Sequence, residues 1–501
     1  MQRATKGFRV FLHAGFVSLL ILGASSSATV ATAQSPGNFT ATGDMTAARN
    51  MHTATLLPNG RVLIAGGFPA FPIGPVLPVA SAELYDPSTG TFTATGDMTT
   101  ARAWHAAVLL ADGRVLIAGG DSLASAELYD PATGTFTAVG HLTILTAVYS
   151  ATVLNDGRVL ITGRAGTSVP AVAGAELYDP ATGTFSPVAS WAGECCVLPL
   201  TLLADGRLLI ADSDDSGDTL ELYDPSTGTF TAAGVNIGSQ YATTLLTNGE
   251  VLFAGGNDDG GWYRSAEVYD ATTGILTATG SMAVARQFES ATLLPDGTVL
   301  MAGGGLLTCT ENGVCMTSAL DSAELYNSAT GTFSATGDMA AGRFQQTAVL
   351  LNSGQVLIAG GVTGIGSGTA PNFAALSSAE LYTPAVLIPA PTLFSLSGDG
   401  TGQGAIWNGL TGQIASPDNP AIAGDVLSMY TTSLFEGGVI PPQVAVGGQL
   451  AGVLYFGDAP GYPGYYQVNF RVPSGVAPGP AVPVRLTYLS RPSNAVTIGV
   501  Q

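Results

Sequence analysis

The chain has 501 residues, of which 46% are hydrophobic and only 10% are charged, and it contains 66 glycines and 29 prolines. This length exceeds one ordinary core and the hydrophobic content excludes a disordered chain, so two domains or a repeat array are expected. The net charge of −20 argues against nucleic acid and anionic membranes as partners, because such a surface repels phosphate groups.

Residues 1–33 have the pattern of a secretory signal peptide. Arg3, Lys6 and Arg9 precede a short apolar run, and Ala31-Thr32-Ala33 offers small residues ahead of a cleavage site. An uncleaved N-terminal anchor is the alternative, but the run is short for a membrane-spanning helix. No later segment is long and apolar enough to span a bilayer. We therefore expect a mature chain that is secreted, whether extracellular, periplasmic or at the cell surface, and not inserted in a membrane.

Export places the four cysteines in an oxidising compartment, where pairing is expected. Cys309 and Cys315 bracket five residues, a loop short enough for a local disulfide. Cys195 and Cys196 are adjacent, so they form either a strained vicinal bridge or two cross-links elsewhere. Three pairings remain open.

A sequence repeat follows the predicted signal peptide. Glu-Leu-Tyr or Glu-Val-Tyr recurs seven times, with its tyrosine at Tyr85, Tyr129, Tyr178, Tyr223, Tyr269, Tyr326 and Tyr382. Each unit reads as an apolar run, an Asn-Gly or Asp-Gly pair, a stretch like "RVLIAGG", then "SAELYDP" and "GTFTA". The glycine pairs supply the positive φ angles of a tight two-residue hairpin, and the continuous apolar run fits a strand covered on both faces. Each unit is therefore predicted to be a four-stranded antiparallel sheet.

The seventh unit lacks its fourth strand, because it ends at "AELYTPAV" and runs into prolines. The N-terminal segment "NFTATGDM", residues 38–45, is a fourth strand with no unit before it. We expect this segment to complete the last unit and so close a ring of seven sheets.

The Gly-Gly pair ending the second strand, the later tyrosine and the aromatic residue after the next turn resemble kelch repeats. These are the blades of kelch-type β-propellers, a group that includes the central domain of galactose oxidase. The resemblance implies an all-β fold with a seven-bladed propeller at residues 35–384, closed by the N-terminal strand. Phenylalanine stands where kelch repeats usually carry tryptophan.

A proline-rich linker is placed at residues 385–392, and the repeat does not continue beyond it. Alternating apolar residues in "YQVNFRV" and "VPVRLTY" predict a small antiparallel sandwich over residues 393–501. This region is similar to an immunoglobulin-like domain that ends many secreted bacterial proteins. Its "GYPGYY" segment, residues 461–466, is either an aromatic contact loop or a loop packed on its own domain.

The likeness to galactose oxidase implies a copper–radical site with two histidines, two tyrosines and a cysteine bonded to one tyrosine. The mature chain has only His52, His105 and His141. His52 and His105 occupy the same repeat position, so ring geometry accounts for both. The sequence therefore does not favour a copper oxidase.

One carboxylate recurs in every unit, which indicates a scaffold role. These residues are Glu83, Glu127, Glu176, Glu221, Glu267, Glu324 and Glu380. Arginine recurs eleven residues before the turn glycine at Arg49, Arg102, Arg286 and Arg343. Because a buried carboxylate needs a partner, we expect these arginines to pair with the glutamates between blades.

Units three to five break this pattern, and such departures tend to gather at functional sites. The arginine becomes Thr146, Cys195 and Gly238, and the Gly-Gly pair becomes Gly163-Arg164 in unit three and Asp212-Ser213 in unit four. Drift of a tolerant ring is the alternative explanation. The candidate ligand-binding residues of these units, all on the face of the strand-two to strand-three loops, are Tyr149, Arg164, Trp191, Asp212, Asp214, Asp215, Tyr241, Asp258, Trp262 and Tyr263.

Acidic and aromatic loops suit a neutral carbohydrate or a cation. The run "DSDDSGD", residues 212–218, resembles a calcium loop only in composition. The sequence thus favours a secreted, non-catalytic protein without a cofactor, calcium being the one ion left open, that binds an extracellular glycan or protein. The alternative is a carbohydrate-active enzyme, of hydrolase, lyase or oxidase type, that uses the acidic residues of units three to five.

Overall fold

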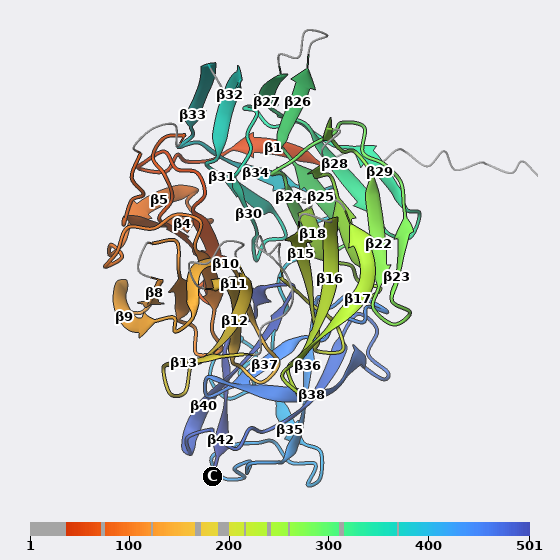
Figure 1. Cartoon of the computed structure of the whole chain (residues 1–501). Coiled ribbons are helices and arrows are strands. Elements are labelled where there is room, and N and C mark those ends of the chain that lie inside the picture. The colour runs from red at the N-terminus through yellow and green to blue at the C-terminus, as the bar shows by residue number, and fades with distance from the viewer. Residues whose placement is uncertain are drawn as a thin grey trace, which may run out of the picture. The chain divides into compact units, whose positions relative to one another are not determined.

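The computed structural model describes residues 37–71, 76–121, 124–165, 172–188, 200–214, 217–237, 242–258, 261–309, 315–367 and 370–501. The expected signal peptide and the Cys195-Cys196 pair lie outside these ranges. All regular elements in the described ranges are β-strands (Figure 1), which confirms the all-β prediction. Accordingly, the described part of the chain holds no helix able to cross a membrane.

Seven four-stranded antiparallel sheets repeat one arrangement within the described residues. The first three units comprise β2 (Thr53–Leu56), β3 (Val62–Ala65), β4 (Ala82–Asp86) and β5 (Thr91–Ala94); β6 (Ala106–Leu109), β7 (Val115–Ala118), β8 (Ser125–Asp130) and β9 (Thr135–His141); and β10 (Leu145–Val153), β11 (Val159–Ala165), β12 (Val172–Asp179) and β13 (Thr184–Pro187). The next two comprise β14 (Leu200–Leu202), β15 (Leu208–Asp214), β16 (Gly217–Asp224) and β17 (Thr229–Ile237); and β18 (Ala242–Leu245), β19 (Val251–Ala254), β22 (Ala266–Asp270) and β23 (Ile275–Ala278). The last two comprise β24 (Ser290–Leu293), β25 (Thr298–Ala302), β28 (Ala323–Asn327) and β29 (Thr332–Ala335); and β30 (Thr347–Leu350), β31 (Val356–Ala359), β34 (Ala379–Thr383) and β1 (Asn38–Ala41).

The N-terminal strand completes the seventh sheet, as the sequence predicts. β1 lies beside β34 and pairs antiparallel with it (Figure 1). Phe39 lies opposite Tyr382, with their ring centroids 4.9 Å apart. Tyr85 and Phe92 make the same contact in the first unit, at 4.8 Å. The first strands of the units contact one another in order, and β30 contacts β2, so the cycle closes. This arrangement is consistent with a β-propeller.

Packing between units uses the repeated tyrosine. Tyr85 is fully buried among side chains of the first and seventh units, and its hydroxyl lies 2.8 Å from the Thr42 hydroxyl. Tyr129 and Thr95 repeat this contact at 3.0 Å. A large apolar ring whose polar end is bonded fills the wedge between two sheets without leaving an unsatisfied hydroxyl.

The turn between the first two strands differs from the predicted two-residue hairpin. The Gly60 amide donates to the Leu57 carbonyl and the Leu57 amide donates to the Arg61 carbonyl, which makes a three-residue loop. Gly60 has a φ of +83°, whereas Asn59 is not left-handed. The turn is therefore the type I turn followed by a left-handed glycine, in which only the glycine needs positive φ.

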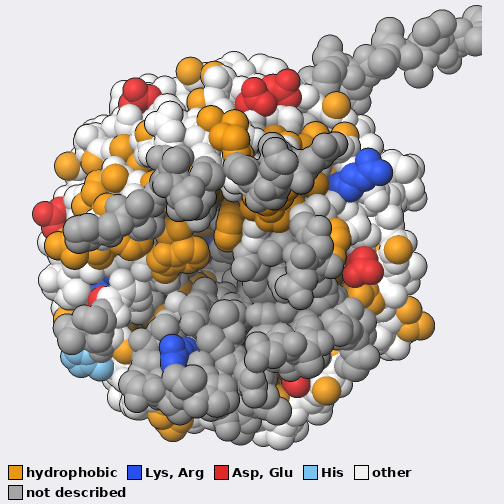
Figure 2. All heavy atoms as spheres, turned by 45° about the horizontal axis from the view of Figure 1, so that its top comes forward, with side chains coloured by type: hydrophobic (Ala, Val, Ile, Leu, Met, Phe, Trp, Pro, Cys, Tyr) orange, Lys and Arg blue, Asp and Glu red, His pale blue; other side chains and the backbone are white. Residues whose placement is uncertain are grey.

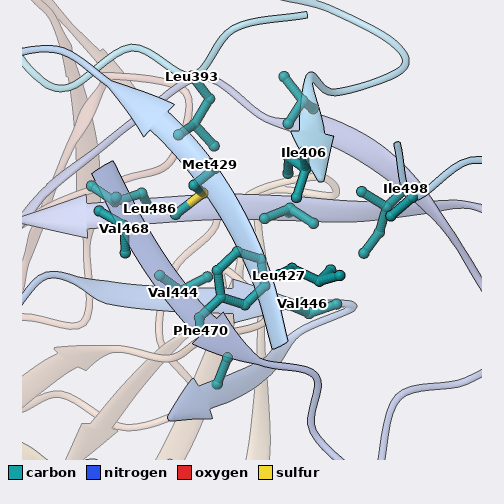
Figure 3. Packing of buried hydrophobic residues seen from close by; sticks show 14 of the residues in the cluster. Leu393, Ile406, Leu427, Met429, Val444, Val446, Val468, Phe470, Leu486 and Ile498 are labelled. Atoms are coloured by element: carbon teal, nitrogen blue, oxygen red, sulfur yellow. The ribbon is translucent and has the colours of Figure 1, made fainter. Parts of the chain in front are cut away.

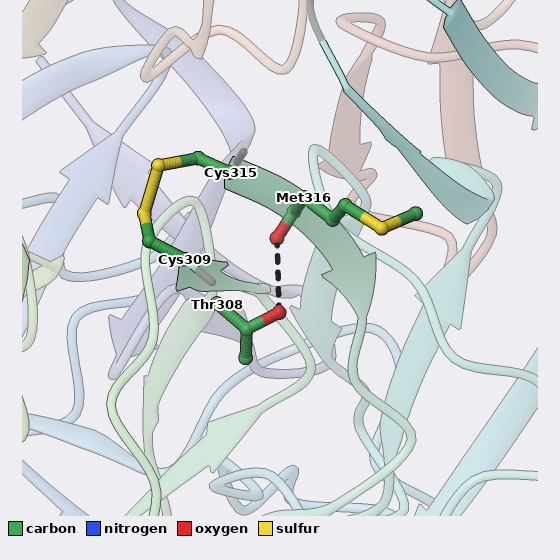
Figure 4. The surroundings of a disulfide bond; sticks show 4 residues. All are labelled: Thr308, Cys309, Cys315 and Met316. Carbon is green, nitrogen blue, oxygen red and sulfur yellow. Dashed lines mark hydrogen bonds between the residues drawn. A yellow bond between two sulfur atoms is a disulfide. The ribbon is translucent and has the colours of Figure 1, made fainter. Parts of the chain in front are cut away.

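Additional hairpins lie between the second and third strands of units five to seven. They comprise β20 (Asn257–Asp258) and β21 (Gly261–Trp262), and a separate sheet of β26 (Gly305–Cys309), β27 (Cys315–Ala319), β32 (Val362–Ser367) and β33 (Ala370–Ala375). Cys309 and Cys315 form the predicted disulfide across the end of β26 and β27 (Figure 4). Thr308 also donates from its hydroxyl to the Met316 carbonyl in the same hairpin.

The C-terminal region forms strands around its own core. They are β35 (Ile406–Asn408), β36 (Val426–Thr431), β37 (Gln443–Val446), β38 (Gln449–Asp458), β39 (Tyr466–Arg471), β40 (Gly479–Tyr488), β41 (Arg491–Pro492) and β42 (Val496–Val500). The core includes Leu427, Val468, Phe470 and Leu486, which come from three strands and point toward one another (Figure 3). The Val439 amide donates to Thr247 beside a first-to-second-strand turn, so these strands meet the repeat at its turn end.

Candidate functional site

The predicted arginine–glutamate pairs form in the structure. Arg49–Glu83 and Arg102–Glu127 are 2.6 Å apart, Arg286–Glu324 2.9 Å and Arg343–Glu380 2.7 Å, and all four guanidiniums are buried. Each arginine lies on the connection into a unit and pairs with the glutamate of that same unit rather than across to another unit. The guanidinium also donates to carbonyls at the end of the second strand, for example from Arg102 to Gly119 at 2.6 Å. The arginine thus fixes the connection to the sheet that follows it.

Backbone amides at the start of the connection donate to the repeated glutamate in units with the arginine, for example from Thr99 and Thr100 to Glu127, and unit three, which lacks the arginine, keeps these donors and adds one more amide. In unit three Glu176 accepts backbone N–H groups from Thr143 at 2.8 Å, Ile144 at 2.8 Å and Leu145 at 2.9 Å. In unit five burial raises the pKa of Glu267. The missing arginines therefore change the local connection and leave the sheets in place.

Strained backbone follows each of the four repeated arginines. Met51, Trp104, Phe288 and Gln345 stand two residues after the arginines and have φ angles of +54° to +60°, a costly conformation for residues with a side chain. The amide of Trp104 donates to Met51, that of Met51 to Gln345, and that of Gln345 to Phe288. We call these four residues the mouth arc. These hydrogen bonds join units six, seven, one and two to one another, just before the first strand of each unit.

The mouth arc ends on aromatic side chains. Trp104, at one end, is 55% exposed and Phe288, at the other, is 37% exposed. Between them lie units three to five, which lack the arginine. Two accessible aromatic rings thus border the interval in which the repeat pattern is broken, and backbone strain of this kind is common at functional sites.

His52 and His105 lie one residue further along and are buried. Nε2 of His105 is 2.8 Å from the Thr53 hydroxyl, and Nε2 of His52 is 3.0 Å from the Thr347 hydroxyl, each in the neighbouring unit. Burial, followed by the charge of the adjacent arginine, lowers the pKa of both imidazoles to about 3. Both histidines are therefore neutral and serve as contacts between units.

Glu289 occupies the same repeat position in unit six and is the most unusual carboxyl of the described chain. Its two oxygens are buried, although its stem is partly exposed, and neither has a hydrogen-bond partner among the described residues. Burial raises the pKa of Glu289 to about 8, an effect that the charge of Arg286 only partly offsets. The carboxyl lies against Gly255 of unit five, and Glu289 directly follows Phe288 in the chain. A proton-exchanging group therefore sits at one end of the mouth arc.

The predicted ligand-binding residues fall in three groups. Trp191, Asp215 and Tyr241 lie outside the described residues. Tyr149 lies in a bulge of β10, and Arg164, Asp212 and Asp214 lie where the second and third strands of units three and four extend past the position of the Gly-Gly turn. Unit five keeps Gly255-Gly256, and Asp258 lies beyond this pair in the separate hairpin of β20 and β21. These hairpins emerge opposite the first-to-second-strand turns. Topology thus gathers them at the end of the molecule that carries the mouth arc.

Trp262 and Tyr263 lie at the boundary of units five and six. The Trp262 ring lies against Gly305, and the Tyr263 carbonyl accepts the Arg286 amide at 3.1 Å. Both residues are half-buried, and the Tyr263 backbone holds the segment that leads to Glu289.

Figure 2 shows one face of the molecule, on which hydrophobic side chains gather in groups and charged side chains are few.

Trp104, Phe288 and Glu289 were not among the site residues predicted from the sequence. Glu289 was detectable, because the position that holds histidine in units one and two holds glutamate in unit six. The strain at Trp104 and Phe288 has no counterpart in residue type, so only the backbone reveals it.

No family model and no curated protein matches the sequence. Among solved structures, the fold is similar to a fungal alcohol oxidase of the AA5 family, solved in complex with copper, with a TM-score of 0.57 and 17% sequence identity. The similarity covers 93% of this chain and 99% of the oxidase chain. At this identity the likeness shows a shared fold.

This comparison corrects two expectations. The expected non-catalytic binding protein is wrong, because the similar fold belongs to an enzyme and supports the enzymatic alternative. The expected absence of a cofactor other than calcium is likewise overturned, because that enzyme was solved with copper.

The described residues do not fit a copper site of the histidine type. One ring nitrogen of His52 and of His105 is hydrogen-bonded to a threonine of the neighbouring unit. Among the described residues, no three His, Cys, Asp or Glu side chains form a group able to hold a metal. The cysteines at 309 and 315 are joined to each other.

Proposed function

We propose that this chain is a secreted carbohydrate-active enzyme of the oxidase type, acting on a hydroxyl group of a sugar or related alcohol at the mouth arc. Its scaffold is proposed to be a seven-bladed kelch-type β-propeller at residues 35–384, joined by a linker at 385–392 to an immunoglobulin-like sandwich at 393–501. The reaction class rests on the likeness in fold to the alcohol oxidase.

The observation that carries the proposal is the Glu289 carboxyl beside the mouth arc. A carboxyl whose pKa is about 8 exchanges a proton near neutral pH, which is the property of an effective general base or acid. In the oxidation of an alcohol by dioxygen, the alcohol loses two electrons and two protons and dioxygen becomes hydrogen peroxide. Glu289 takes the hydroxyl proton in this scheme, and a redox cofactor would carry the two electrons to dioxygen, although no three His, Cys, Asp or Glu side chains of the described residues form a group that could hold a metal.

The two exposed rings of the mouth arc suit a sugar or alcohol substrate. Trp104 and Phe288 offer apolar faces to the C–H side of such a molecule. Trp104 and Phe288 therefore orient the substrate, and Glu289 handles its proton.

Hydrogen peroxide release from the mature chain tests this function. The protein is treated with Cu²⁺ or with a chelator and offered glycerol, galactose and neutral oligosaccharides. We expect peroxide from at least one of them, with a rate that rises with pH as Glu289 loses its proton near pH 8. Glu289→Gln is expected to lower kcat by about 100-fold or more, whereas Glu436→Gln, an exposed carboxyl elsewhere, leaves it unchanged.

The pH limb separates the enzyme classes. A hydrolase that used Glu289 as its general acid would lose activity as pH rises through the same range, so cleavage of oligosaccharides with that profile overturns the oxidase assignment. Peroxide release of unchanged rate in Glu289→Gln removes Glu289 from the mechanism.

A further inference from the structure

A second concave site lies in the C-terminal region, on strands separate from the mouth arc. It is a cavity of about 670 Å³ lined by Phe394, Trp407, Ser428, Tyr430, Tyr462, Tyr465 and Gln467. Five of these seven residues are aromatic and none is charged. We call this set the aromatic cleft.

The floor of the aromatic cleft is the outer face of a sheet. Ser428 and Tyr430 alternate along β36 with the buried core residues Leu427 and Met429, so their side chains point away from the core. Trp407 on β35 lies opposite Ser428 in the strand register, and Gln467 on β39 lies opposite Tyr430. The sheet therefore fixes four of the lining side chains by its pleat.

The walls come from two segments that pack onto this floor. Tyr462 lies against Tyr430 with ring centroids 6.0 Å apart, and Tyr465 lies against Phe394 at 5.6 Å. Trp407 and Tyr430 are themselves 5.7 Å apart, edge to face. The rings thus support one another at steep angles and leave a hollow between them.

The loop that carries Tyr462 and Tyr465 is held by its own backbone. The Ala459 amide donates to Tyr465 at 2.9 Å, the Tyr462 amide to Ala459 at 3.0 Å and the Tyr465 amide to Tyr462 at 3.1 Å. Tyr462 is nonetheless 60% exposed and Tyr465 43% exposed. The segment at 461–466 therefore does both things that the sequence left open, since it packs on its own domain and presents aromatic rings to solvent.

We propose that the aromatic cleft binds a neutral glycan chain. Aromatic faces receive the C–H side of a pyranose ring, and the cleft has the size of a small-ligand site. Ser428 donates to Asn469 at 2.7 Å and Gln467 donates to the same oxygen at 2.8 Å, so both polar side chains are oriented beside the rings. Because no charged side chain lines the cleft and the chain carries a net charge of −20, an acidic glycan is disfavoured.

The site is an accessory one, distinct from the mouth arc, and does not depend on Glu289. Its role is to hold the enzyme on a polymer while chemistry occurs elsewhere, which raises the local concentration of substrate.

Affinity electrophoresis of the mature full-length protein tests this site. The gels contain galactomannan, mixed-linkage β-glucan or xylan, with polygalacturonate as the acidic comparator. We expect retarded migration in at least one neutral polysaccharide and none in polygalacturonate. The double variant Tyr462→Ala, Tyr465→Ala should weaken the retardation by about tenfold or more, the effect of losing two stacking rings.

Matched variants separate binding from folding. Tyr455→Ala removes a 44% exposed tyrosine of the same domain outside the cleft and should bind like the parent protein. Tyr462→Trp keeps an aromatic face and should retain binding. Peroxide release from a small soluble alcohol should be the same in the double variant and the parent, so loss of glycan binding and loss of catalysis remain distinguishable.

The proposal is overturned if no neutral polysaccharide retards the folded protein, if the double variant migrates like the parent protein, or if Tyr455→Ala loses as much affinity as the double variant. Retention by an immobilised peptide library and by no polysaccharide identifies the aromatic cleft as a protein-binding site and also overturns it.

Discussion

Units one, two, six and seven and units three to five are built on one repeat and differ in how their connections are held. In the first set a buried arginine joins each connection to the glutamate of its unit, and the residue two positions later adopts positive φ. In the second set the arginine is absent, and Glu176 keeps the two backbone amides that Glu127 also accepts and gains the Leu145 amide and the Thr143 hydroxyl. The sheets of both sets remain four-stranded. The arginine thus stabilises the connections and not the sheets, so the units that lack it can carry other residues at this position.

The largest expected effect tests whether the arginine-bearing units are continuous across the chain ends. The mouth arc passes from unit seven to unit one, and β1 completes the sheet of unit seven. A chain that starts at Thr46 lacks β1, exposes the edge of β34 and removes Phe39 from Tyr382. We expect unfolding in urea to show a loss of several kcal/mol, because this chain also lacks the buried Met45 side chain and the half-buried Phe39 ring.

A chain that starts at Ser35 keeps β1 and serves as the control, with the stability of the mature protein. An unchanged urea midpoint for the shorter chain would contradict the closure of the seventh sheet by the N-terminal strand.

The next effect compares the two ways of holding the glutamate. Arg102→Leu removes the ion-pair partner of the buried Glu127 carboxylate and leaves it the Thr99 and Thr100 amides, and breaking one half of such a pair costs about 3–5 kcal/mol. Thr143→Val in unit three removes one hydroxyl donor from Glu176, which keeps three backbone donors, and should cost about 1 kcal/mol. Urea denaturation of both variants measures the difference. Equal costs would mean that the arginine is not the main support of its connection.

Much of the scaffold could be predicted from repeated residues, whereas the candidate site could not. The tyrosine of each unit, the turn glycine and the unpaired segment at 38–45 all act through local pattern, so they predicted the sheets and the closing strand. The arginine–glutamate pairs followed from the rule that a buried carboxylate needs a partner. The turn was predicted with the wrong geometry, because Asn-Gly fits both a two-residue loop and a type I turn with a left-handed glycine.

The site depends on features that residue types do not reveal. Positive φ at Trp104 and Phe288 arises from hydrogen bonds between neighbouring units, which are distant in sequence. The raised pKa of Glu289 arises from burial of its carboxyl against Gly255, again across a unit boundary. The aromatic cleft joins Phe394, Trp407 and Tyr462 from three segments. Contacts of this long range require the coordinates.

A smaller effect tests the end of the mouth arc at Glu289. Its pKa is raised from about 4.5 to about 8, so the folded state holds a proton that the unfolded state releases across this range. Stability therefore falls as pH rises from 4.5 to 8, and Glu289→Gln should remove that fall. We expect the variant to be more stable than the parent protein at pH 9 and little changed at pH 4.

Thermal or urea unfolding at both pH values measures this change, and Glu436→Gln, an exposed carboxyl, should leave the pH dependence intact. A Glu289→Gln variant with the same loss of stability at pH 9 as the parent protein would show that Glu289 ionises normally and is not a buried acid.

The smallest effect asks whether the hairpins beyond the sheets are independent of them. The disulfide between Cys309 and Cys315 closes β26 and β27, which belong to a separate sheet above units six and seven. Closing so short a loop stabilises its hairpin by about 2 kcal/mol in the chain-entropy account. Replacing both cysteines with serine should therefore speed amide hydrogen exchange in β26 and β27, while exchange in β24 and β25 and the urea midpoint stay unchanged.

The four-stranded sheets can stay the same in all units only if the hairpins that extend from them vary independently of the sheets. Faster exchange throughout β24 and β25 would mean instead that the extension is part of the sixth sheet's cooperative unit, and that changes in the loops of units three to five are felt by the sheets below them.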